Sequence, residues 1–267
     1  MKQFLIFFSL FFLFKINAQV NCEAFKYYGD TLQYKACKVV ENIDEKHSQF
    51  SREFQELYDK AITICPHFAY AYREKSVAYV KSGDFLTWKN LMDKAVKYDE
   101  RGNLGYRGWC KYQFFKDYKG AIEDFETLEK LEKNIGYSQN GDYHLQIAKA
   151  ICYSALGEKR KAIEIINKQI SQKDYQIGLF DYYQLGVTYF QIGNYENAKI
   201  AFQKQTKINQ FAENLFYLGQ ISKIENRISE YKSTKEKAIE LYKNGKNLKD
   251  NYTHHFNKVY LETIEKD

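Results

Sequence analysis

Apolar and polar residues alternate with a helical period in a long central part of the chain. Between residues 179 and 212 two apolar stripes follow one another, and a glycine separates them. Their positions are, in order, Tyr182, Leu185, Gly186, Tyr189, Gly193, Tyr195, Ala198 and Phe202. Spacings of three and four residues place such side chains on one face of a helix. The pattern therefore predicts two amphipathic helices joined by a tight turn at Gly193.

The same pattern recurs at nearly constant intervals, which indicates an internal repeat. The predicted units span about residues 69–102, 103–132, 143–175, 179–212 and 212–245. Their second helices start near Trp88, Ala121, Ala162, Ala198 and Tyr231. The one long step, from Ala121 to Ala162, contains the polar segment 133–142, whose Asn and Gly content predicts an inserted loop.

The unit at 179–212 has the spacing aromatic-x-x-Leu-Gly-x-x-Tyr followed by Ala-x-x-x-Phe. This spacing resembles the tetratricopeptide repeat (TPR), with Tyr182 in place of the family's Trp, and the resemblance is to exported proteins of bacterial type. It implies an all-α fold, a right-handed α-solenoid of stacked helix–turn–helix repeats with helical caps. Stacking explains why several units are needed, because a single hairpin cannot bury both of its faces. Small residues at Gly186 and Gly219 are expected where paired helices approach closely.

The regions outside the repeats are expected to cap the array. We expect residues 19–66 to form an irregular helical cap that ends in a partial repeat. Pro66 closes this partial repeat, because proline cannot continue a helix. At the other end, residues 246–267 predict a capping helix. Its apolar stripe is Phe256, Val259, Tyr260 and Ile264.

The first eighteen residues have the features of a secretory signal peptide. Lys2 precedes an apolar run from Phe4 to Phe14, and Ala18 is a small residue at a suitable cleavage position. The run is too short to span the hydrocarbon core of a membrane. We therefore expect cleavage after Ala18, a periplasmic or extracellular location, and no membrane span in the mature chain. Residues 19–21 depart from the pattern that precedes a lipidated cysteine, so Cys22 is not expected to carry a lipid.

Composition and charge exclude several classes of protein. Hydrophobic residues make up 45% of the chain, which is enough for a substantial core, and the single proline argues against an all-β fold rich in turns. The net charge of +6 would fall to +4 on loss of Lys2 and Lys15. So small a positive charge gives no reason to expect a nucleic-acid partner.

The sequence offers little catalytic chemistry. Its five cysteines and five histidines form no Cys-x-x-Cys or His-Glu-x-x-His motif, so neither a metal site nor a cofactor is expected. Cys65 and His67 flank Pro66 and could form a nucleophile with its base, but the repeat pattern already explains this segment as a helix end. We expect no catalytic residue and no enzyme activity. Cys22 and Cys37 form a candidate disulfide, and the alternative is that they stay unpaired.

In the TPR family the first helices line a concave groove that contacts ligands. Carrying the family's contact positions over gives these candidate groove residues: Tyr70, Arg73, Val77, Phe180, Tyr183, Val187, Phe190 and Phe216. The alternative is that these aromatic side chains pack between neighbouring units. Val77, Tyr183 and Val187 stand where one subtype of the family has the polar residues that clamp a C-terminal carboxylate, so that mode of binding is not expected.

The resemblance implies a non-catalytic protein–protein interaction module or scaffold of the periplasm or cell envelope. It would bind a peptide or helix in a concave aromatic groove, although the sequence does not identify the partner. One alternative is a structural subunit of an envelope complex that works through its convex face. A further alternative is a small-molecule carrier or an enzyme, with its site in the N-terminal region or in the loop at 133–142.

Overall fold

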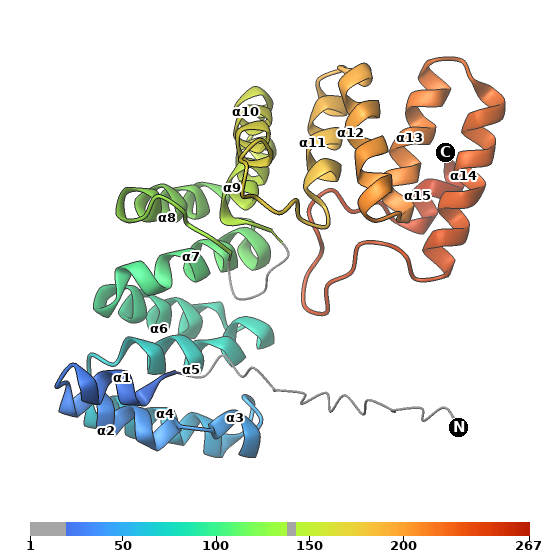
Figure 1. Cartoon of the computed structure of the whole chain (residues 1–267). Coiled ribbons are helices and arrows are strands. Elements are labelled where there is room, and N and C mark those ends of the chain that lie inside the picture. Colours follow the sequence, from blue (N-terminus) through green and yellow to red (C-terminus); the bar gives the residue numbers. More distant parts are fainter. Residues whose placement is uncertain (1–19, 138–142) are drawn as a thin grey trace, which may run out of the picture. The chain divides into compact units, whose positions relative to one another are not determined.

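The computed structural model describes residues 20–137 and 143–267, and it shows a chain of helices (Figure 1). The expected signal peptide at 1–18 and part of the expected loop, residues 138–142, lie outside the described residues. Across those two ranges every regular element is a helix, apart from one isolated bridge between Tyr137 and His144. The predicted all-α fold is therefore confirmed. The chain divides into two compact units, residues 1–75 and 76–267.

The first unit is built from short helices held together by an aromatic core. They are α1 (Cys22–Tyr27), α2 (Thr31–Val40), α3 (Ile43–Lys46) and α4 (Arg52–Ile64), and the start of α5 (Ala69–Ser82) also belongs to this unit. Phe54, Tyr58 and Phe68 are almost completely buried in its core. A disulfide joins Cys22 to Cys37 with their Cα atoms 5.5 Å apart, so it fastens α1 to α2. Helix α4 ends two residues before Pro66.

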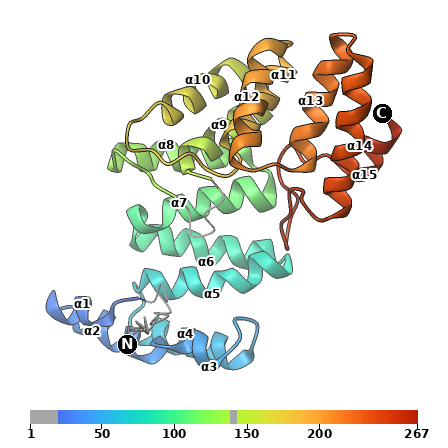
Figure 2. The same cartoon turned by 45° about the vertical axis from the view of Figure 1, so that its right-hand side comes forward.

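The second unit contains successive pairs of helices, which Figures 1 and 2 show following one another. After the end of α5, its elements are α6 (Phe85–Tyr98), α7 (Glu100–Cys110), the π-helix η1 (Lys111–Phe115), α8 (Tyr118–Leu131), α9 (Leu145–Ala155), α10 (Lys159–Ile170), α11 (Asp181–Gln191), α12 (Tyr195–Ile208), α13 (Ala212–Ile224), α14 (Ile228–Lys243) and α15 (Leu261–Lys266). Each helix from α6 to α15 packs on the next one along the chain. This nearest-neighbour packing is the arrangement expected of repeats that share a continuous core.

Capping residues set the helix boundaries inside the repeats. The side chains of Asp84, Asp99, Asp117 and Asn194 each accept a hydrogen bond from the backbone N–H three residues later. Such a cap satisfies a donor that the first turn of a helix leaves unpaired. Because Asp99 caps the N–H of Gly102, α7 begins at Glu100. The predicted unit boundary at 102–103 is therefore three residues too late.

The residues after α14 differ from the expected capping helix. Gly245 has a φ of 75° and, with Lys246, donates back to the last turn of α14, so the helix ends there in a Schellman motif. Residues 246–260, which we name the strap, contain no helix. Asn257 also has a left-handed φ of 61° that a helix does not allow. The helix that does form, α15, is short, and its Ile264 is buried beside Leu215 and Ala238.

Candidate binding groove

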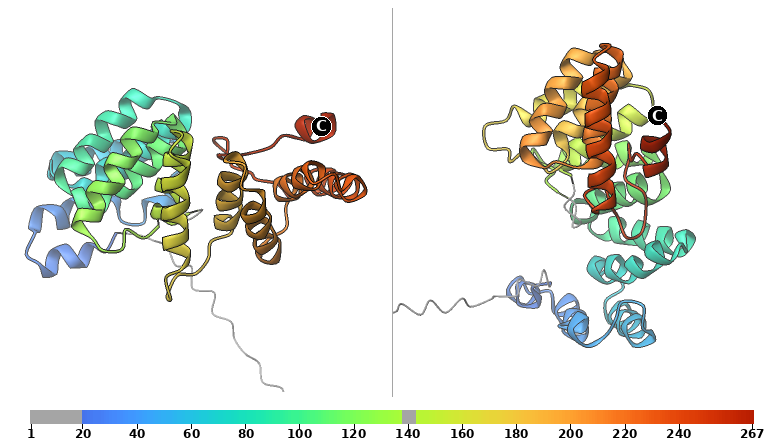
Figure 3. Two further views of the ribbon diagram at one scale, coloured as in Figure 1. Left: turned by 90° about the horizontal axis from the view of Figure 1, so that it is seen from above. Right: turned by 90° about the vertical axis from the view of Figure 1, so that its right-hand side faces the viewer.

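The strap runs along the first-helix side of the second unit and returns to α15 beside α14 (Figures 1 and 3). We name the surface that it contacts the inner face, which is formed by Gln113, Lys116, Tyr118, Tyr183, Gln184 and Glu213. Five of these residues come from η1, α8, α11 and α13, and Lys116 lies directly after η1. The inner face therefore joins elements from successive repeats.

On α11 two polar side chains bind the backbone of the strap. The Tyr183 hydroxyl donates to the carbonyl oxygen of Asn257 at 2.5 Å, and the Gln184 amide nitrogen lies 3.4 Å from the carbonyl oxygen of Phe256. Gln184 also accepts a hydrogen bond of 2.8 Å from the side chain of Asn257. Gln184 is held in place by a further bond to the Tyr143 hydroxyl at 2.8 Å. This part of the inner face binds peptide groups and one side-chain amide.

On α13 a fully buried carboxylate holds both ends of the strap. Glu213 accepts hydrogen bonds of 3.1 and 3.2 Å from the backbone N–H of Leu248, and its Oε1 lies 3.4 Å from the ammonium of Lys258. The same ammonium donates to the Leu248 carbonyl oxygen. Burial raises the pKa of Glu213 despite these partners. A carboxylate in this position depends on the strap for its compensating charge.

The tip of the strap is fastened to η1 and α8. Thr253 donates through its hydroxyl to the Gln113 carbonyl oxygen at 3.0 Å, and the Lys116 ammonium donates to the His254 carbonyl oxygen at 3.0 Å. The rings of Tyr118 and Phe256 meet edge to face with centroids 5.9 Å apart. The contacts at η1 again use backbone groups, and Phe256 supplies an aromatic contact.

The last residue of the chain is also bound by α13 and α14. The Asp267 carboxylate accepts from Lys223 at 2.9 Å, from the Tyr231 hydroxyl at 3.0 Å and from Gln220. Gln220 and Lys223 lie on α13, which is the first helix of the pair α13 and α14. This helix therefore binds the acidic side chain of Asp267 from the same chain.

The predicted groove residues lie in different surroundings. In the first unit, Tyr70 is half-buried under the Arg73 guanidinium, which also pairs with Glu74 at 2.8 Å. In the second unit, Tyr183 and Val187 are fully buried in a cluster with Phe202 and Phe211, and the half-buried residues are Val77, Phe180, Phe190 and Phe216. Phe180 contacts the strap through His255, with ring centroids 5.9 Å apart. Tyr183 and Phe180 are thus the predicted residues with a ring or hydrogen-bond contact to the strap.

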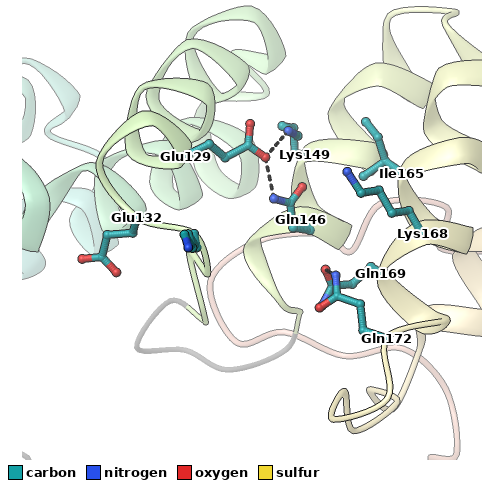
Figure 4. Close-up of a pocket in the computed structure, with 9 residues that line it drawn as sticks. Glu129, Glu132, Gln146, Lys149, Ile165, Lys168, Gln169 and Gln172 are labelled. Carbon is teal, nitrogen blue, oxygen red and sulfur yellow. Dashed lines mark hydrogen bonds and ion pairs between the residues drawn. The ribbon is translucent and has the colours of Figure 1, made fainter.

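A polar pocket of about 380 Å³ lies between α8, α9 and α10 (Figure 4). In it the Glu129 carboxylate accepts hydrogen bonds from Gln146 and from the nearly buried Lys149, and Gln169 and Gln172 line the other side. A neighbouring pocket of about 420 Å³ shares those two glutamines and includes His144. Burial lowers the pKa of His144 to about 4, so its ring is neutral at physiological pH. Among the charged side chains that line these pockets, Glu129 pairs with Lys149, and Glu132 pairs with Arg101.

The cysteines show little sign of nucleophilic chemistry. The Cys65 sulfur lies 3.5 Å from a ring nitrogen of His67, but the sulfur is buried and burial raises the pKa of the thiol. Since the thiolate is the reactive form, a raised pKa disfavours reaction. Cys110 and Cys152 are buried too, and burial raises their pKa values well above the usual range. In the described ranges no three His, Cys, Asp or Glu side chains gather in a way that would hold a metal ion.

Residues that sequence reasoning did not single out are Gln184, Asn257 and Lys258, which form much of the contact between the inner face and the strap. One signal for the strap is present in the sequence. The pair Asn244-Gly245 favours the end of a helix, and the polar run that follows it is a poor match to an amphipathic helix.

None of the helices within residues 20–137 and 143–267 is both long enough and apolar enough to cross a membrane.

Comparisons with known proteins agree with the repeat. Residues 182–211 match the model of the tetratricopeptide repeat. Over 133 residues the chain is 27% identical to the peptidyl-prolyl cis-trans isomerase PASTICCINO1 of Arabidopsis thaliana. That match covers 48% of this chain but only 20% of the plant protein.

Several solved structures are similar across most of both chains. PilW, a widely conserved type IV pilus biogenesis factor, has a TM-score of 0.61 at 13% identity, covering 79% of this chain and 94% of PilW. PilF of Pseudomonas aeruginosa has a TM-score of 0.59 at 14% identity, covering 82% and 94%. YrrB, described as a TPR protein with an unusual peptide-binding site, has a TM-score of 0.51 at 19% identity, covering 70% and 90%. At these identities the likeness shows the fold. The repeat match, the successive helix pairs and the shared fold together show a tetratricopeptide repeat at residues 182–211 within a fold similar to that of these solved structures.

Proposed function

We propose that this chain is a non-catalytic scaffold that binds a non-helical segment of another polypeptide on its inner face. The observation that carries this proposal is the strap itself. Residues 246–260 lie against the inner face without helical structure, and side chains of α11 and α13 hydrogen-bond to their backbone. A surface that holds one non-helical segment in this way has the groups needed to hold another.

The kind of contact supports a polypeptide ligand. Tyr183 and Lys116 donate to backbone carbonyl oxygens, and Glu213 accepts from a backbone N–H. Peptide groups are common to every protein segment, whereas a small molecule would need an enclosed and mostly apolar pocket. YrrB, a TPR protein with an unusual peptide-binding site, is in line with this function.

The absence of catalysis is part of the proposal. Cys65 and His67 are the one cysteine and histidine pair that the sequence suggested, and burial keeps that thiol protonated. Isomerase activity belongs by name to the plant relative, of which the match covers a fifth. A prolyl isomerase assay on the purified chain tests this directly. We expect the rate to equal that of the uncatalysed reaction, and acceleration at catalytic protein concentrations would contradict the proposal.

We further propose that the chain is exported and acts in the periplasm or cell envelope. The support is the signal-like sequence of residues 1–18, together with the disulfide between Cys22 and Cys37, since disulfides persist in oxidising compartments. Cell fractionation followed by N-terminal sequencing tests this. We expect the mature chain outside the cytoplasm to begin at Gln19, and an intact Met1 in the exported protein would contradict cleavage.

The binding function is tested by quantitative affinity capture from envelope extract. Phe216→Ala alters a half-buried side chain of α13 that packs against the cluster containing Val259 of the strap, and Ile200→Ala is the matched control because Ile200 is 44% exposed on a second helix, α12. We expect Phe216→Ala to lose a specific protein that wild type and Ile200→Ala both retain. Loss with Ile200→Ala alone would favour a structural subunit that works through its second helices. Equal recovery by all three would contradict binding at the inner face.

A further inference from the structure

We infer that residues 249–258 of the strap are an internal ligand, and that the partner is a non-helical segment with an aromatic residue two positions before a lysine or arginine. This inference rests on the proposed function and specifies the partner. In the strap these positions are Phe256 and Lys258, with Asn257 between them. The partner segment would take the place of residues 249–258 on the inner face.

The need for a basic residue follows from Glu213. Its side chain is 0% exposed, and among the residues that the structure describes its cationic partner is Lys258 of the strap. If residues 249–258 moved away, the carboxylate would lose that charge, and a buried charge without a partner is strongly destabilising. A segment that supplies a lysine or arginine would restore the pair, whereas an acidic segment would place like charges together. Charge complementarity thus selects a basic residue at this position.

The need for an aromatic residue follows from the contacts of Phe256. Its ring meets Tyr118 edge to face, and its carbonyl oxygen faces the amide nitrogen of Gln184. The next carbonyl oxygen, that of Asn257, accepts from Tyr183. Two successive peptide groups are therefore bound next to the aromatic side chain. This arrangement recognises an aromatic side chain together with the backbone turn at Phe256 and Asn257.

The middle of the strap has the features of a segment that can open. Leu248 and Val259 are buried and anchor its two ends. Between them Lys249, Asn251, Tyr252 and His254 are exposed, and His255 is the one residue of 249–258 that is buried. Segments with little buried apolar surface open locally at low free-energy cost. Residues 249–258 can thus leave the inner face while the anchors stay in place, and the main cost is loss of the pair of Glu213 and Lys258, which a basic residue of the partner restores.

The covalent link makes the strap a strong competitor. A tethered segment acts at a high effective concentration, so a free segment of similar chemistry binds weakly while the strap is intact. Weakening the strap should therefore increase binding of a segment added in trans. This gain separates a displaceable ligand from a fixed structural part, because damage to a fixed part would only reduce binding.

The test uses the full chain and a fluorescent peptide with the sequence of residues 248–260. Lys258→Ala weakens the strap within the chain and leaves the inner face unchanged, so the peptide can supply the missing lysine. Lys237→Ala is the matched control, because Lys237 is exposed on α14. We expect the Lys258→Ala chain to bind the peptide at least about tenfold more tightly than the control chain does, a difference of about 1.4 kcal/mol. A peptide with alanine at the position of Lys258 should lose most of this gain in affinity.

A second variant guards against misfolding of the first. Phe256→Ala removes the ring contact with Tyr118 and leaves the pair of Glu213 and Lys258 intact, and it should also increase peptide binding. Circular dichroism shows whether each variant keeps its helices. Equal binding by the folded variants and the control, or equal binding of both peptides, would overturn the inference. A dimer of the Lys258→Ala chain that excludes the peptide would overturn it as well, since a second copy would then be the occupant. These failures leave the capture experiment with Phe216→Ala unaffected, so the two proposals can fail separately.

Discussion

Tyr183 donates its hydroxyl hydrogen to the carbonyl oxygen of Asn257 at 2.5 Å, across 74 positions of sequence. Tyr183 stands at a position where the TPR family contacts ligands, and here its contact is the protein's own strap. The ring is fully buried against Phe202 and Phe211, so only the hydroxyl group reaches the strap. One residue thus serves both the core of the repeat and the inner face.

Tyr183→Phe should loosen the strap without disturbing the core. The variant keeps the buried ring and removes one hydrogen bond, which is worth about 1 kcal/mol. We expect faster amide hydrogen exchange in residues 249–258, measured by mass spectrometry. Tyr182→Phe on the same helix is the control and should leave that exchange unchanged. Equal exchange in both variants would contradict the role given to the Tyr183 hydroxyl.

Two glycines at equivalent positions should respond in opposite directions. A Cβ at Gly186 would lie 2.5 Å from a ring atom of Phe202, whereas a Cβ at Gly219 would meet its nearest neighbours at an ordinary 3.7 Å. Gly186→Ala should therefore destabilise by about 1–3 kcal/mol through overpacking. Gly219→Ala should stabilise by about 0.5–1 kcal/mol, because alanine is the better helix former. Thermal unfolding measures both, and a shift in the same direction would contradict the packing described for α11 and α12.

His144 should make stability depend on pH. Its ring nitrogen accepts from the N–H of Gln146 at 3.1 Å and caps α9, while burial lowers its pKa from 6.5 to about 4. Above pH 6.5 the ring is neutral in the folded and the unfolded chain. As the pH falls from 6.5 towards 4 the unfolded chain binds the extra proton, so the stability contributed by His144 is lost by up to about 1.4 kcal/mol per pH unit.

The matched variant for this prediction is His144→Asn, which keeps a capping acceptor but does not titrate. Urea unfolding at pH 7 and at pH 4.5 gives the free energy of unfolding of both chains. Other groups titrate equally in the two chains, so the difference between them isolates His144. We expect wild type to lose more stability than the variant on acidification. Equal losses would contradict a buried, neutral His144.

The disulfide should stabilise the first unit. Cys22 and Cys37 close a loop with a sequence separation of 15 residues, for which the chain-entropy model gives about 3 kcal/mol. Replacing both cysteines with serine should lower the free energy of unfolding of that unit by a comparable amount, and its unfolding temperature should fall accordingly. The buried Cys65→Ser is the control for a loss that does not involve a disulfide. Peptide mapping without reductant should show the Cys22 and Cys37 peptides linked in wild type.

The repeat could be predicted because its signals are local. Helical spacing around Tyr182 and Phe202 and the tight turn at Gly193 are all contained within one unit, and the recurrence of that unit gives the fold. Boundaries were less predictable, because one capping side chain decides them. Asp99 starts α7 three residues before the predicted boundary at 102–103.

The strap could not be predicted, because its contacts are far apart in sequence. The stripe of Phe256, Val259 and Ile264 has helical spacing, but the backbone of Phe256 and Asn257 is bound by Gln184 and Tyr183 instead. Competition between a weak local helix and strong distant contacts is invisible to a periodicity argument. For the same reason the pairing of Glu213 with Lys258 gave no sequence signal, although the two side chains lie side by side in the structure.

The central claim is that the inner face binds a non-helical segment, in this structure its own strap. The most direct test places a photoreactive benzoylphenylalanine at position 256 of the full chain. Because Phe256 meets Tyr118 at 5.9 Å, we expect a crosslink within one chain to the peptide that contains Tyr118. Excess peptide with the sequence of residues 248–260 should lower the yield of that crosslink. Crosslinks that avoid α8 and α11, or a yield that the peptide does not change, would contradict the claim.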